Sequence, residues 1–505
     1  MLSVVNSATL EGIDAYEVKV EVDLGRGLPS FNIVGLPDTA IKESRERVEA
    51  AIRNSGFDFP VKRITVNLAP AGIKKEGAIF DLPIAIGILS SSKKVIKKDV
   101  KGWVILGELS LNGEVRPIKG ILSVCLYFRK KRIKGLIIPY ENLFEAKVVE
   151  GVKVYPVKNL IDACKIINGE KVEYEEEERE IFEDENYDVD FLDVKGQILA
   201  KKAIEVAVSG GHNIIFIGPP GAGKTLLARR IPTILPEMTL EEAIQTTRIY
   251  SVSGLLPKGI GLLRKRPFRS PHHTISDVAL IGGGTHPKPG EVSLAHNGVL
   301  FLDELPEFSR KVLESLRIPL EDRVVTISRV NSTITYPANF MLVASMNPCP
   351  CGFLGHPEKE CTCTPNQVLK YRKKISGPLL DRIDIQVEVP ALKYEELSVD
   401  ENYSSSKMRE RVKKARQIQL ERFKKEKFFT NSMIPTNKIE RYCKIDEKAK
   451  KILEFAFKKF SFSLRVYDRL IRIARTIADL DEREIINEED IATAIQFRFL
   501  DKPVI

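Results

Sequence analysis

The sequence predicts an α/β nucleotide-binding core that is preceded by an α+β domain and followed by a helical domain. The chain has 505 residues, 43% of them hydrophobic, which is enough for about three domains of ~150 residues, each with its own core. Between about Asp193 and Pro390, short apolar runs alternate with helical stretches, as in a parallel sheet covered on both faces. The first of these runs, Ile214–Ile217, leads into a glycine-rich turn that opens a helix.

The first predicted domain comprises residues 1–168. Short β-rich runs at Tyr16–Val22, Arg63–Leu68 and Leu136–Pro139 are mixed with helical stretches such as Asp38–Ser55. Turn residues separate these segments, so that the pattern is typical of one compact α+β domain.

Two changes in composition divide the rest of the chain. Residues 169–190 are rich in Glu and Asp, which repel one another and leave little apolar surface to bury. We predict an exposed linker there; the alternative is a capped acidic helix. The α/β core follows at 191–392, with further buried strands at Val299–Leu302 and Phe340–Ala344. Residues 393–505 are almost wholly helical and amphipathic, as in a separate helical domain.

Charge and hydropathy exclude some classes of protein. The chain has 78 Lys and Arg against 69 Asp and Glu, a mild basic excess that permits nucleic acid as a partner without arguing for it. Its longest apolar runs fall far short of the ~20 residues that cross a bilayer, and its N-terminus lacks the features of an export signal. We therefore expect a cytoplasmic protein with no membrane partner.

The segment from Gly218 to Thr225 has the GxxxxGK[ST] spacing of a phosphate-binding loop between a strand and a helix. Lys224 is expected to reach the β- and γ-phosphates, and Thr225 to offer its hydroxyl to Mg²⁺. The remaining loop residues direct main-chain N–H groups at the β-phosphate; they are Gly218, Pro219, Pro220, Gly221, Ala222 and Gly223. This motif predicts a nucleoside triphosphate site.

Two carboxylates and one amide are predicted to complete this site. The strand Val299–Leu302 ends at Asp303, which would hold Mg²⁺ through water, and at Glu304, which would polarise the attacking water. The next predicted strand is followed by Asn347, whose amide could contact the γ-phosphate or position water; alternatively, Asn347 caps a turn. The combination predicts hydrolysis as well as binding.

Long stretches of the sequence resemble one protein family. The phosphate loop, the two carboxylates, the asparagine and the helical C-terminal region resemble an AAA+ P-loop ATPase. Three segments have sequences that resemble the magnesium chelatase-like family, close to its competence-associated ComM/YifB branch: Arg266–Gly284, Pro289–Phe308 and Ser376–Ile385. The resemblance covers nearly the whole chain. It implies ATP and Mg²⁺ as cofactors and a C-terminal α-helical lid on the ATPase core.

The same resemblance assigns roles to two arginines. Arg382 lies where related helicases place an arginine finger, which inserts into the nucleotide site of the neighbouring subunit and therefore implies a ring. Arg465 matches the sensor arginine that couples nucleotide state to the angle of the lid, with Arg469 as the competing candidate. The alternative for Arg382 and Arg465 is an ordinary surface ion pair.

Two segments are candidates for contact with nucleic acid. The residues 324–336 predict a β-hairpin, which in helicase-like relatives points into the central pore, and Arg329 near its tip would meet a phosphate backbone. The hairpin could instead only pack against a neighbour. Arg266 and Arg269 lie in a basic segment with an aromatic residue, which suits nucleic acid and a subunit interface equally.

Four of the seven cysteines lie close together as two C-x-C pairs, which could supply a tetrahedral zinc site. They are Cys349, Cys351, Cys361 and Cys363, and His356 between the pairs is a substitute ligand. Loop thiols without metal and a redox disulfide are the alternatives, because C-x-C is tighter than the usual spacing. The family resemblance includes these cysteines without settling their role.

The N-terminal domain resembles the Lon-protease-like (S5-type) fold in Glu76–Leu89 and Leu106–Gly120. A Lon peptidase needs a serine nucleophile and a lysine base in its active site. Here Ile79 or Phe80 stands near the serine position and Val124 at the lysine position, so that the dyad is missing and we expect no proteolysis. Basic residues of this domain could hold DNA, as in related recombination ATPases, or be solvated; they are Lys62, Arg63, Lys74, Lys75 and Arg116.

The resemblance implies a homo-hexameric, ATP-driven DNA motor that migrates branches in recombination intermediates, working with recombination proteins in natural transformation. The rival hypothesis is a chelatase-type or protein-remodelling motor that acts through a partner subunit. Against the rival, the chain carries a Lon-like domain and no metal-ion-binding integrin-like domain. A scaffold that binds nucleotide without hydrolysis is disfavoured by Glu304.

Overall fold

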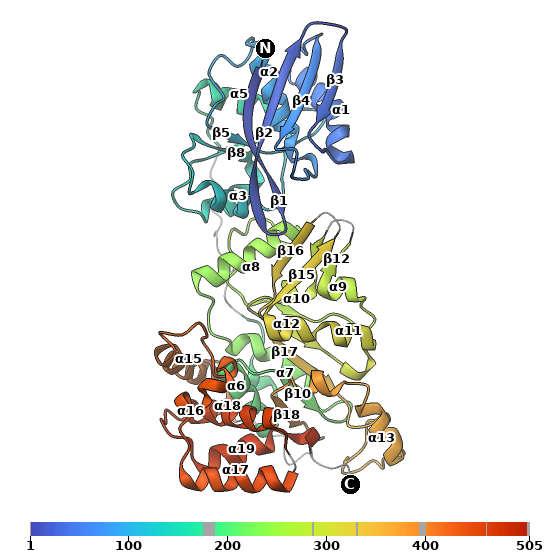
Figure 1. Cartoon of the computed structure of the whole chain (residues 1–505), viewed down its shortest axis with the longest axis vertical. Helices are drawn as coiled ribbons and strands as arrows, with labels where there is room; N and C mark the ends of the chain where they lie inside the picture. Colours follow the sequence, from blue (N-terminus) through green and yellow to red (C-terminus); the bar gives the residue numbers. More distant parts are fainter. Residues whose placement is uncertain are drawn as a thin grey trace. The chain divides into compact units, whose positions relative to one another are not determined.

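The computed structural model describes residues 2–174, 187–284, 287–329, 332–392, 400–460 and 462–501. The chain folds into two compact units (Figure 1). One contains Met1–Asp184 together with Leu240–Arg264, and the other contains Glu185–Thr239 and Lys265–Ile505. The segment Leu240–Arg264, which the sequence analysis assigned to the ATPase core, thus packs with the N-terminal unit. Within the described residues, no helix is both long and apolar enough to cross a membrane.

The N-terminal unit is built on a seven-stranded sheet in the order β3-β4-β2-β1-β5-β8-β9. Strand β2 is antiparallel to both β1 and β4, whereas the other neighbours are parallel. The strands are β1 (Leu2–Glu11), β2 (Asp14–Gly25), β3 (Ser30–Val34), β4 (Arg63–Ala69), β5 (Trp103–Ile105), β8 (Gly135–Pro139) and β9 (Val154–Val157), with a separate ribbon of β6 (Glu108–Leu109) and β7 (Val115–Arg116).

Helices cover this sheet, and their sequences account for where they begin and what they bury. Asp38 caps α1 by accepting a hydrogen bond of 2.8 Å from the N–H of Ile41. Helix α2 is apolar nearly all round and is buried on nearly every side, as expected for a core helix. The helices are α1 (Thr39–Asn54), α2 (Asp81–Ser92), α3 (Ile121–Phe128), α4 (Leu143–Lys147), α5 (Leu160–Asn168) and α8 (Leu240–Ser253).

Helix α8 joins the N-terminal unit through polar contacts. Arg248 donates hydrogen bonds to the hydroxyl of Ser123 at 3.0 Å and to the carbonyl of Ile13 at 2.7 Å. Ser251 bonds to the buried carboxyl group of Glu145, whose pKa is raised by burial. These partners are distant in sequence, which is why the pattern of α8 alone does not reveal where it packs.

The second unit contains a five-stranded, all-parallel sheet in the order β11-β14-β17-β10-β18. The strands are β10 (Ile214–Ile217), β11 (Phe268–Arg269), β14 (Val299–Leu302), β17 (Met341–Met346) and β18 (Ile385–Glu388). Because the strands are parallel, the loops after β10, β14 and β17 meet at one edge of the sheet. The predicted strands Ile214–Ile217 and Val299–Leu302 are confirmed.

Short helices and two hairpins are attached to this sheet. The helices are α6 (Ile198–Gly210), α7 (Lys224–Arg230), α9 (Asp277–Ile281), α10 (Glu291–Leu294), α11 (Arg310–Ser315), α12 (Arg317–Asp322), α13 (Pro365–Arg372) and α14 (Gly377–Leu380). The hairpins are β12 (Gly282–Gly283) with β13 (Lys288–Pro289), and β15 (Val324–Arg329) with β16 (Ser332–Pro337). The predicted hairpin over 324–336 is therefore present, although the side chain of Arg329 lies outside the described residues.

The C-terminal region is helical, as predicted. Its helices are α15 (Ser405–Arg422), α16 (Ile439–Tyr442), α17 (Glu447–Phe460), α18 (Leu464–Leu480) and α19 (Glu488–Gln496). Helix α18 has a pronounced apolar face, and its residues Leu470 and Ile473 share one hydrophobic core with Val206 of α6 and Phe216 of β10. The C-terminal helices thus share one hydrophobic core with the α/β sheet.

Candidate functional site

The phosphate loop connects β10 to α7, and its glycines are required by its backbone. Gly221 and Gly223 have φ angles of 80° and 88°, which side chains other than glycine rarely adopt. A Cβ atom on Gly218 would lie 2.0 Å from the carbonyl oxygen of Val389. Gln197, which the sequence analysis missed, supports the loop by donating a hydrogen bond of 3.2 Å to the carbonyl of Ala222 and one of 2.8 Å to that of Pro390.

Lys224 stands at the start of α7 with its ammonium group inside the loop. Nζ donates to the carbonyls of Gly218 and Pro219 at 2.6 and 2.9 Å and to Oδ1 of Asn347 at 3.1 Å. Burial lowers the pKa of Lys224, and the nearby carboxylates of Asp303 and Glu304 oppose this effect. The structure therefore brings the predicted lysine and the predicted asparagine together.

The hydroxyl of Thr225 donates a hydrogen bond of 2.8 Å to Oδ2 of Asp303, which follows β14. Oδ1 of the same carboxylate accepts from the hydroxyl of Ser345 on β17 and from the N–H of Glu304 at 3.1 Å. The N–H of Glu304 also lies 3.2 Å from the hydroxyl oxygen of Ser345. Ser345 is fully buried and is a second residue that the sequence analysis did not assign to the site.

Glu304 differs from Asp303 in its setting. Its φ angle is 54°, an uncommon conformation for a residue with a side chain, and its carboxylate is largely exposed. Nδ1 of His273 lies 3.9 Å from Oε2 of Glu304. The carboxylate is thus directed into solvent at the same sheet edge, as a group that meets water must be.

These residues fit a nucleoside triphosphate with Mg²⁺. A hydroxyl and a carboxylate that already contact each other, Thr225 and Asp303, provide the oxygen ligands that Mg²⁺ prefers. A loop of glycines before a helix N-terminus, with a lysine inside it, suits the phosphates. When bound, Mg²⁺ would neutralise charge on the phosphates, and Thr225 and Asp303 are the residues that would hold it.

The two arginines that the family resemblance assigns, Arg382 and Arg465, lie on neighbouring segments of the structure. Arg382 contacts Glu321 and donates a hydrogen bond of 2.7 Å to the carbonyl of Pro378. Arg465 is 74% exposed and lies 3.5 Å from Asp381, the residue before Arg382. The assignments of Arg382 as a finger and of Arg465 as a sensor stay predictions, because they concern a neighbouring subunit or a bound nucleotide.

Arg469, one turn after Arg465, lies 3.3 Å from Asp384. Burial alone would raise the pKa of Asp384, but the hydrogen bond with His212 and the charges of Arg469 and Arg472 more than offset it, so that this pKa lies below its usual value. The carboxylate of Asp384 therefore joins β18 to the C-terminal helix α18.

Both arginines of the second nucleic-acid candidate have partners within their own unit. The Arg266 guanidinium donates to the carbonyl of Asn297 at 2.8 Å and to that of Glu237 at 3.1 Å. Arg269 forms a bidentate ion pair with Glu291, in which Nε donates to Oε2 at 2.6 Å and Nη2 to Oε1 at 2.7 Å. These bonds occupy part of the donors of each guanidinium, and a contact of Arg266 and Arg269 with nucleic acid stays a prediction.

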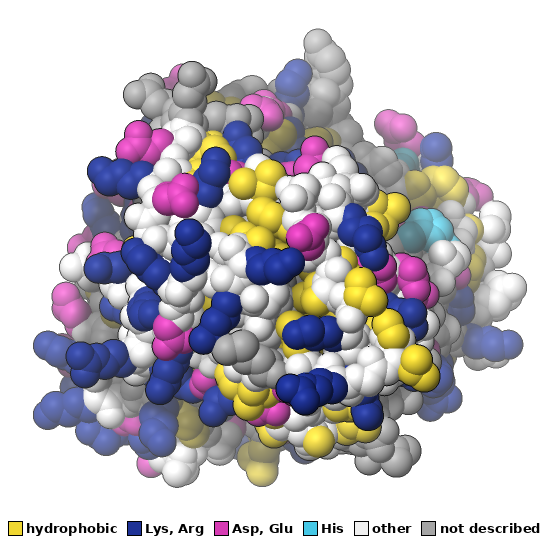
Figure 2. Space-filling model, turned by 90° about the horizontal axis from the view of Figure 1, so that it is seen from above, with side chains coloured by type: hydrophobic (Ala, Val, Ile, Leu, Met, Phe, Trp, Pro, Cys, Tyr) yellow, Lys and Arg dark blue, Asp and Glu magenta, His cyan; other side chains and the backbone are white. Residues whose placement is uncertain are grey.

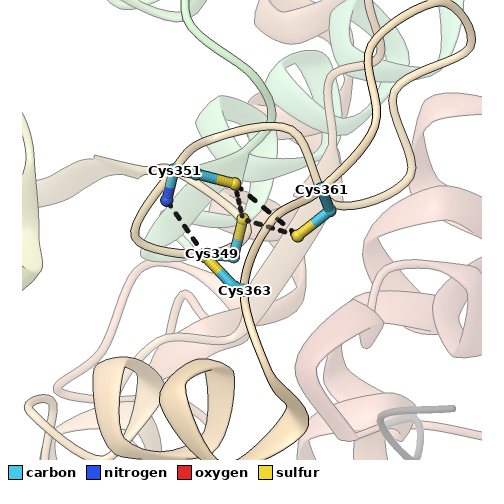
Figure 3. Close-up of side chains that lie close together, drawn as sticks. All are labelled: Cys349, Cys351, Cys361 and Cys363. Atoms are coloured by element: carbon cyan, nitrogen blue, oxygen red, sulfur yellow. Dashed lines mark hydrogen bonds between the residues drawn. The ribbon is translucent and has the colours of Figure 1, made fainter.

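The four clustered cysteines lie together in the loop between β17 and α13 (Figure 3). All four Sγ atoms are within 4.8 Å of one another, and the Sγ of Cys349 lies 3.3 Å from that of Cys351 and 3.6 Å from that of Cys361. Four thiolates around Zn²⁺ at ~2.3 Å form a group of about this size. The cluster could therefore hold a metal ion.

This cysteine loop is also in contact with the phosphate loop. It begins two residues after Asn347, and a Cβ atom on Gly352 would lie 2.7 Å from Cδ of Pro220. Hydrogen bonds, the strongest of them from the backbone N–H of Phe353 and others from Cys349 and Cys363, lower the pKa of Cys351 to about 6. Whatever fixes the four thiols thus also fixes the backbone beside the nucleotide site.

In the N-terminal unit, the residues at the two peptidase positions are apolar and buried. Phe80 and Val124 have no exposed surface, and the half-buried Ile79 packs against both of the hydrophobic clusters to which they belong. Lys75, which the sequence analysis counted among surface cations, is also fully buried, and its ammonium group bonds to the carbonyl of Pro70. That part of the DNA hypothesis is wrong, because a buried amine cannot meet a phosphate backbone.

Comparison with known proteins agrees with the geometry of the site. The family descriptions "Subunit ChlI of Mg-chelatase", "Magnesium chelatase, subunit ChlI" and "Magnesium chelatase, subunit ChlI C-terminal" match residues 20–142, 190–397 and 402–498. The chain is 43% identical to competence protein ComM of Haemophilus influenzae, over 98% of this chain and 97% of that protein. It is 40% identical to the uncharacterized protein YifB of Escherichia coli, over 100% of this chain and 98% of that protein.

A shorter similarity links part of the chain to a peptidase family. Over 28% of this chain and 28% of that protein, the sequence is 30% identical to Lon protease 2 of Bacillus subtilis. The partial resemblance to Lon proteases is thereby confirmed. Since the magnesium chelatase descriptions match the nucleotide site and both flanking regions, and since the similarity to ComM spans nearly the full length, this chain belongs to the magnesium chelatase subunit ChlI family of AAA+ ATPases.

Proposed function

We propose that this protein is an ATP-hydrolysing, hexameric ring motor that acts on DNA and migrates branches in recombination intermediates during natural transformation. The observation that carries the ATPase is the meeting of Lys224, Thr225, Asp303 and Asn347 at one edge of the parallel sheet. Glu304, exposed beside them, polarises the attacking water. Lys224 and the loop backbone hold the triphosphate.

The ring follows from Arg382. Arg382 follows α14 and bonds to Glu321 and to the carbonyl of Pro378, whereas Thr225 and Asp303 bond to each other. This position suits a residue that serves the nucleotide site of the neighbouring subunit. There it offsets charge that develops on the γ-phosphoryl group. Each active site then needs two copies of the chain.

DNA is proposed as the substrate from the full-length relation to a competence protein, together with the hairpin β15–β16. Arg329 is the last residue of β15, paired with Ser332 in the antiparallel ladder, and thus sits at the turn of the hairpin. Repeated around a ring, such arginines would offer a positive collar to a phosphate backbone.

We also propose that the four cysteines bind Zn²⁺. Their Sγ atoms are close enough to share one ion, and soft thiolate ligands select zinc among the common divalent ions. The ion would be structural: with four protein ligands it has no open position for a substrate, and it would hold the loop that packs against Pro220.

Steady-state ATPase activity at fixed salt tests the proposed function, with no DNA, single-stranded DNA, duplex DNA or a synthetic four-way junction added. We expect stimulation by DNA that is greatest for the junction. Arg329→Ala should lose stimulation and keep basal turnover. Robust turnover that no DNA stimulates would instead favour a chelatase-type or protein-remodelling motor that acts through a partner subunit.

A further inference from the structure

One end of the N-terminal sheet carries an unusual concentration of positive charge. Strands β5, β8 and β9 are parallel neighbours, so the loops that enter them lie at the same edge of the sheet. These loops, residues 93–101, 129–134 and 150–153, contain eleven Lys and Arg and two acidic residues. This excess is as large as the net charge of +9 of the entire chain. We call these three loops the basic loop surface.

The three loops form one continuous surface. Nζ of Lys134 donates a hydrogen bond of 3.2 Å to the carbonyl of Asp99, which joins the first two loops. The N–H of Leu136, near the start of β8, donates to the carbonyl of Lys153 at 2.8 Å, which places the third loop beside the strand that the second loop enters. Lys131 and Lys134 of the second loop and Lys153 of the third also line one open hollow of about 480 Å³, together with Trp103 of β5 and Tyr155 of β9.

The charge of this surface is exposed and mostly uncompensated. All eleven cationic residues are exposed. Among the residues that the structure describes, only Lys94 and Lys131 of the eleven form ion pairs, with Asp58 and Glu17. Figure 2, which looks onto the face uppermost in Figure 1, shows many Lys and Arg side chains with fewer Asp and Glu between them. Like charges held this close repel one another, and a polyanion would relieve the repulsion.

The chemistry of the surface favours nucleic acid over a lipid membrane. None of the large exposed hydrophobic side chains lies in these three loops, all of which the structure describes. Peripheral membrane anchors insert apolar side chains beside their basic residues. The cations instead come from three separate loops at one edge of the sheet, two of which line one hollow, and this arrangement suits a backbone that presents phosphates at regular intervals.

We propose that the basic loop surface binds the phosphodiester backbone of DNA without reading its sequence. The proposal rests on the proposed DNA motor and adds a second contact, on the N-terminal unit and separate from Arg329. Lysine-to-phosphate contacts release counterions, so the affinity must fall steeply as salt rises. The cations suggested from sequence have weaker claims: Lys74 and Arg116 are paired with Glu76 and Glu108, and Lys75 is buried.

The test is binding of the full-length protein to a labelled DNA duplex of random sequence, measured across a salt series. The variant carries Lys97→Glu, Lys98→Glu and Arg132→Glu, three exposed residues that form no ion pair with any residue that the structure describes. We expect its Kd to rise on the order of tenfold or more, and the slope of log K against log salt to fall by about 0.9 for each phosphate that the variant no longer neutralises. Basal ATPase activity without DNA should stay unchanged, which shows that the variant is folded.

A matched control makes the same change of charge on the C-terminal helix α17, with Lys448→Glu, Lys450→Glu and Lys451→Glu. If the loop variant binds duplex with the affinity and salt slope of this control, the inference is overturned while the DNA motor stands. If the wild-type protein binds no DNA at all, both proposals fall. Binding of wild type, but not of the loop variant, to phosphatidylglycerol vesicles in place of DNA would also overturn it, in favour of a membrane surface.

Discussion

Replacing Ser345 with alanine should slow ATP hydrolysis while leaving ATP binding intact. The Ser345 hydroxyl donates to Oδ1 of Asp303 and lies 3.2 Å from the N–H of Glu304, so it ties the loop after β14 to the neighbouring strand β17. In the variant, Asp303 keeps the hydroxyl of Thr225 and the N–H of Glu304 as donors. The variant lacks one hydrogen bond to a charged group, which is worth about 1.5–3 kcal/mol, or roughly 10- to 150-fold in rate if all of it acts in the transition state.

The assay is kcat at saturating Mg²⁺ and ATP, paired with equilibrium binding of a fluorescent ATP analogue. Ser345 has no contact with the phosphate loop among its hydrogen bonds, so the Kd of the analogue should change less than about threefold, which corresponds to under ~0.7 kcal/mol. Asn347→Ala is the matched variant. Asn347 directly follows the same strand, and its side chain contacts Lys224 rather than Asp303. Normal kcat for Ser345→Ala would refute the view that this hydroxyl positions the catalytic carboxylates.

Three other groups of residues carry further predictions. Arg382→Ala should lose about 10³-fold or more in hydrolysis with binding retained, and mixing it with Glu304→Gln subunits should restore activity; no recovery in the mixture would contradict a finger in trans. Purified wild type should contain one zinc per chain by metal analysis and Cys349→Ser none, whereas Cys443→Ser, outside the cluster, should keep it. Asp384→Asn should cost about 3 kcal/mol of stability at neutral pH. Because the pKa of Asp384 is depressed in the folded state, thermal melts should show this difference fully above pH ~3.9 and fading as the pH falls further.

The phosphate site could be predicted from sequence because its signals are local. The strand Ile214–Ile217, the glycines that need positive φ and the lysine at the start of α7 are consecutive in the chain. Asp303 and Asn347 were predictable for a related reason: each follows an apolar strand, and carboxyl ends of parallel strands share one edge.

Ser345 and Gln197 could not be predicted in the same way. A serine inside a buried strand has no pattern that separates it from any other core residue, and its role arises only because β17 lies beside β14. Gln197 acts on the loop from a turn that precedes α6. Helix α8 shows the same limit for packing, since its partner Glu145 is 106 residues away in sequence. Lys75 shows that charge in a sequence does not establish exposure.

The residues around Arg382, the proposed arginine finger, connect it to the C-terminal helix α18. Asp381 and Asp384 lie on either side of Arg382 in the chain and form ion pairs with Arg465 and Arg469 of α18. The two arginines are four residues apart, so they lie on one face of the helix, and both hold the same short loop. Arg382 itself forms its ion pair with Glu321. A rotation of α18 relative to the sheet must therefore break both pairs or move the loop, and in the second case the angle of the helix sets the position of Arg382.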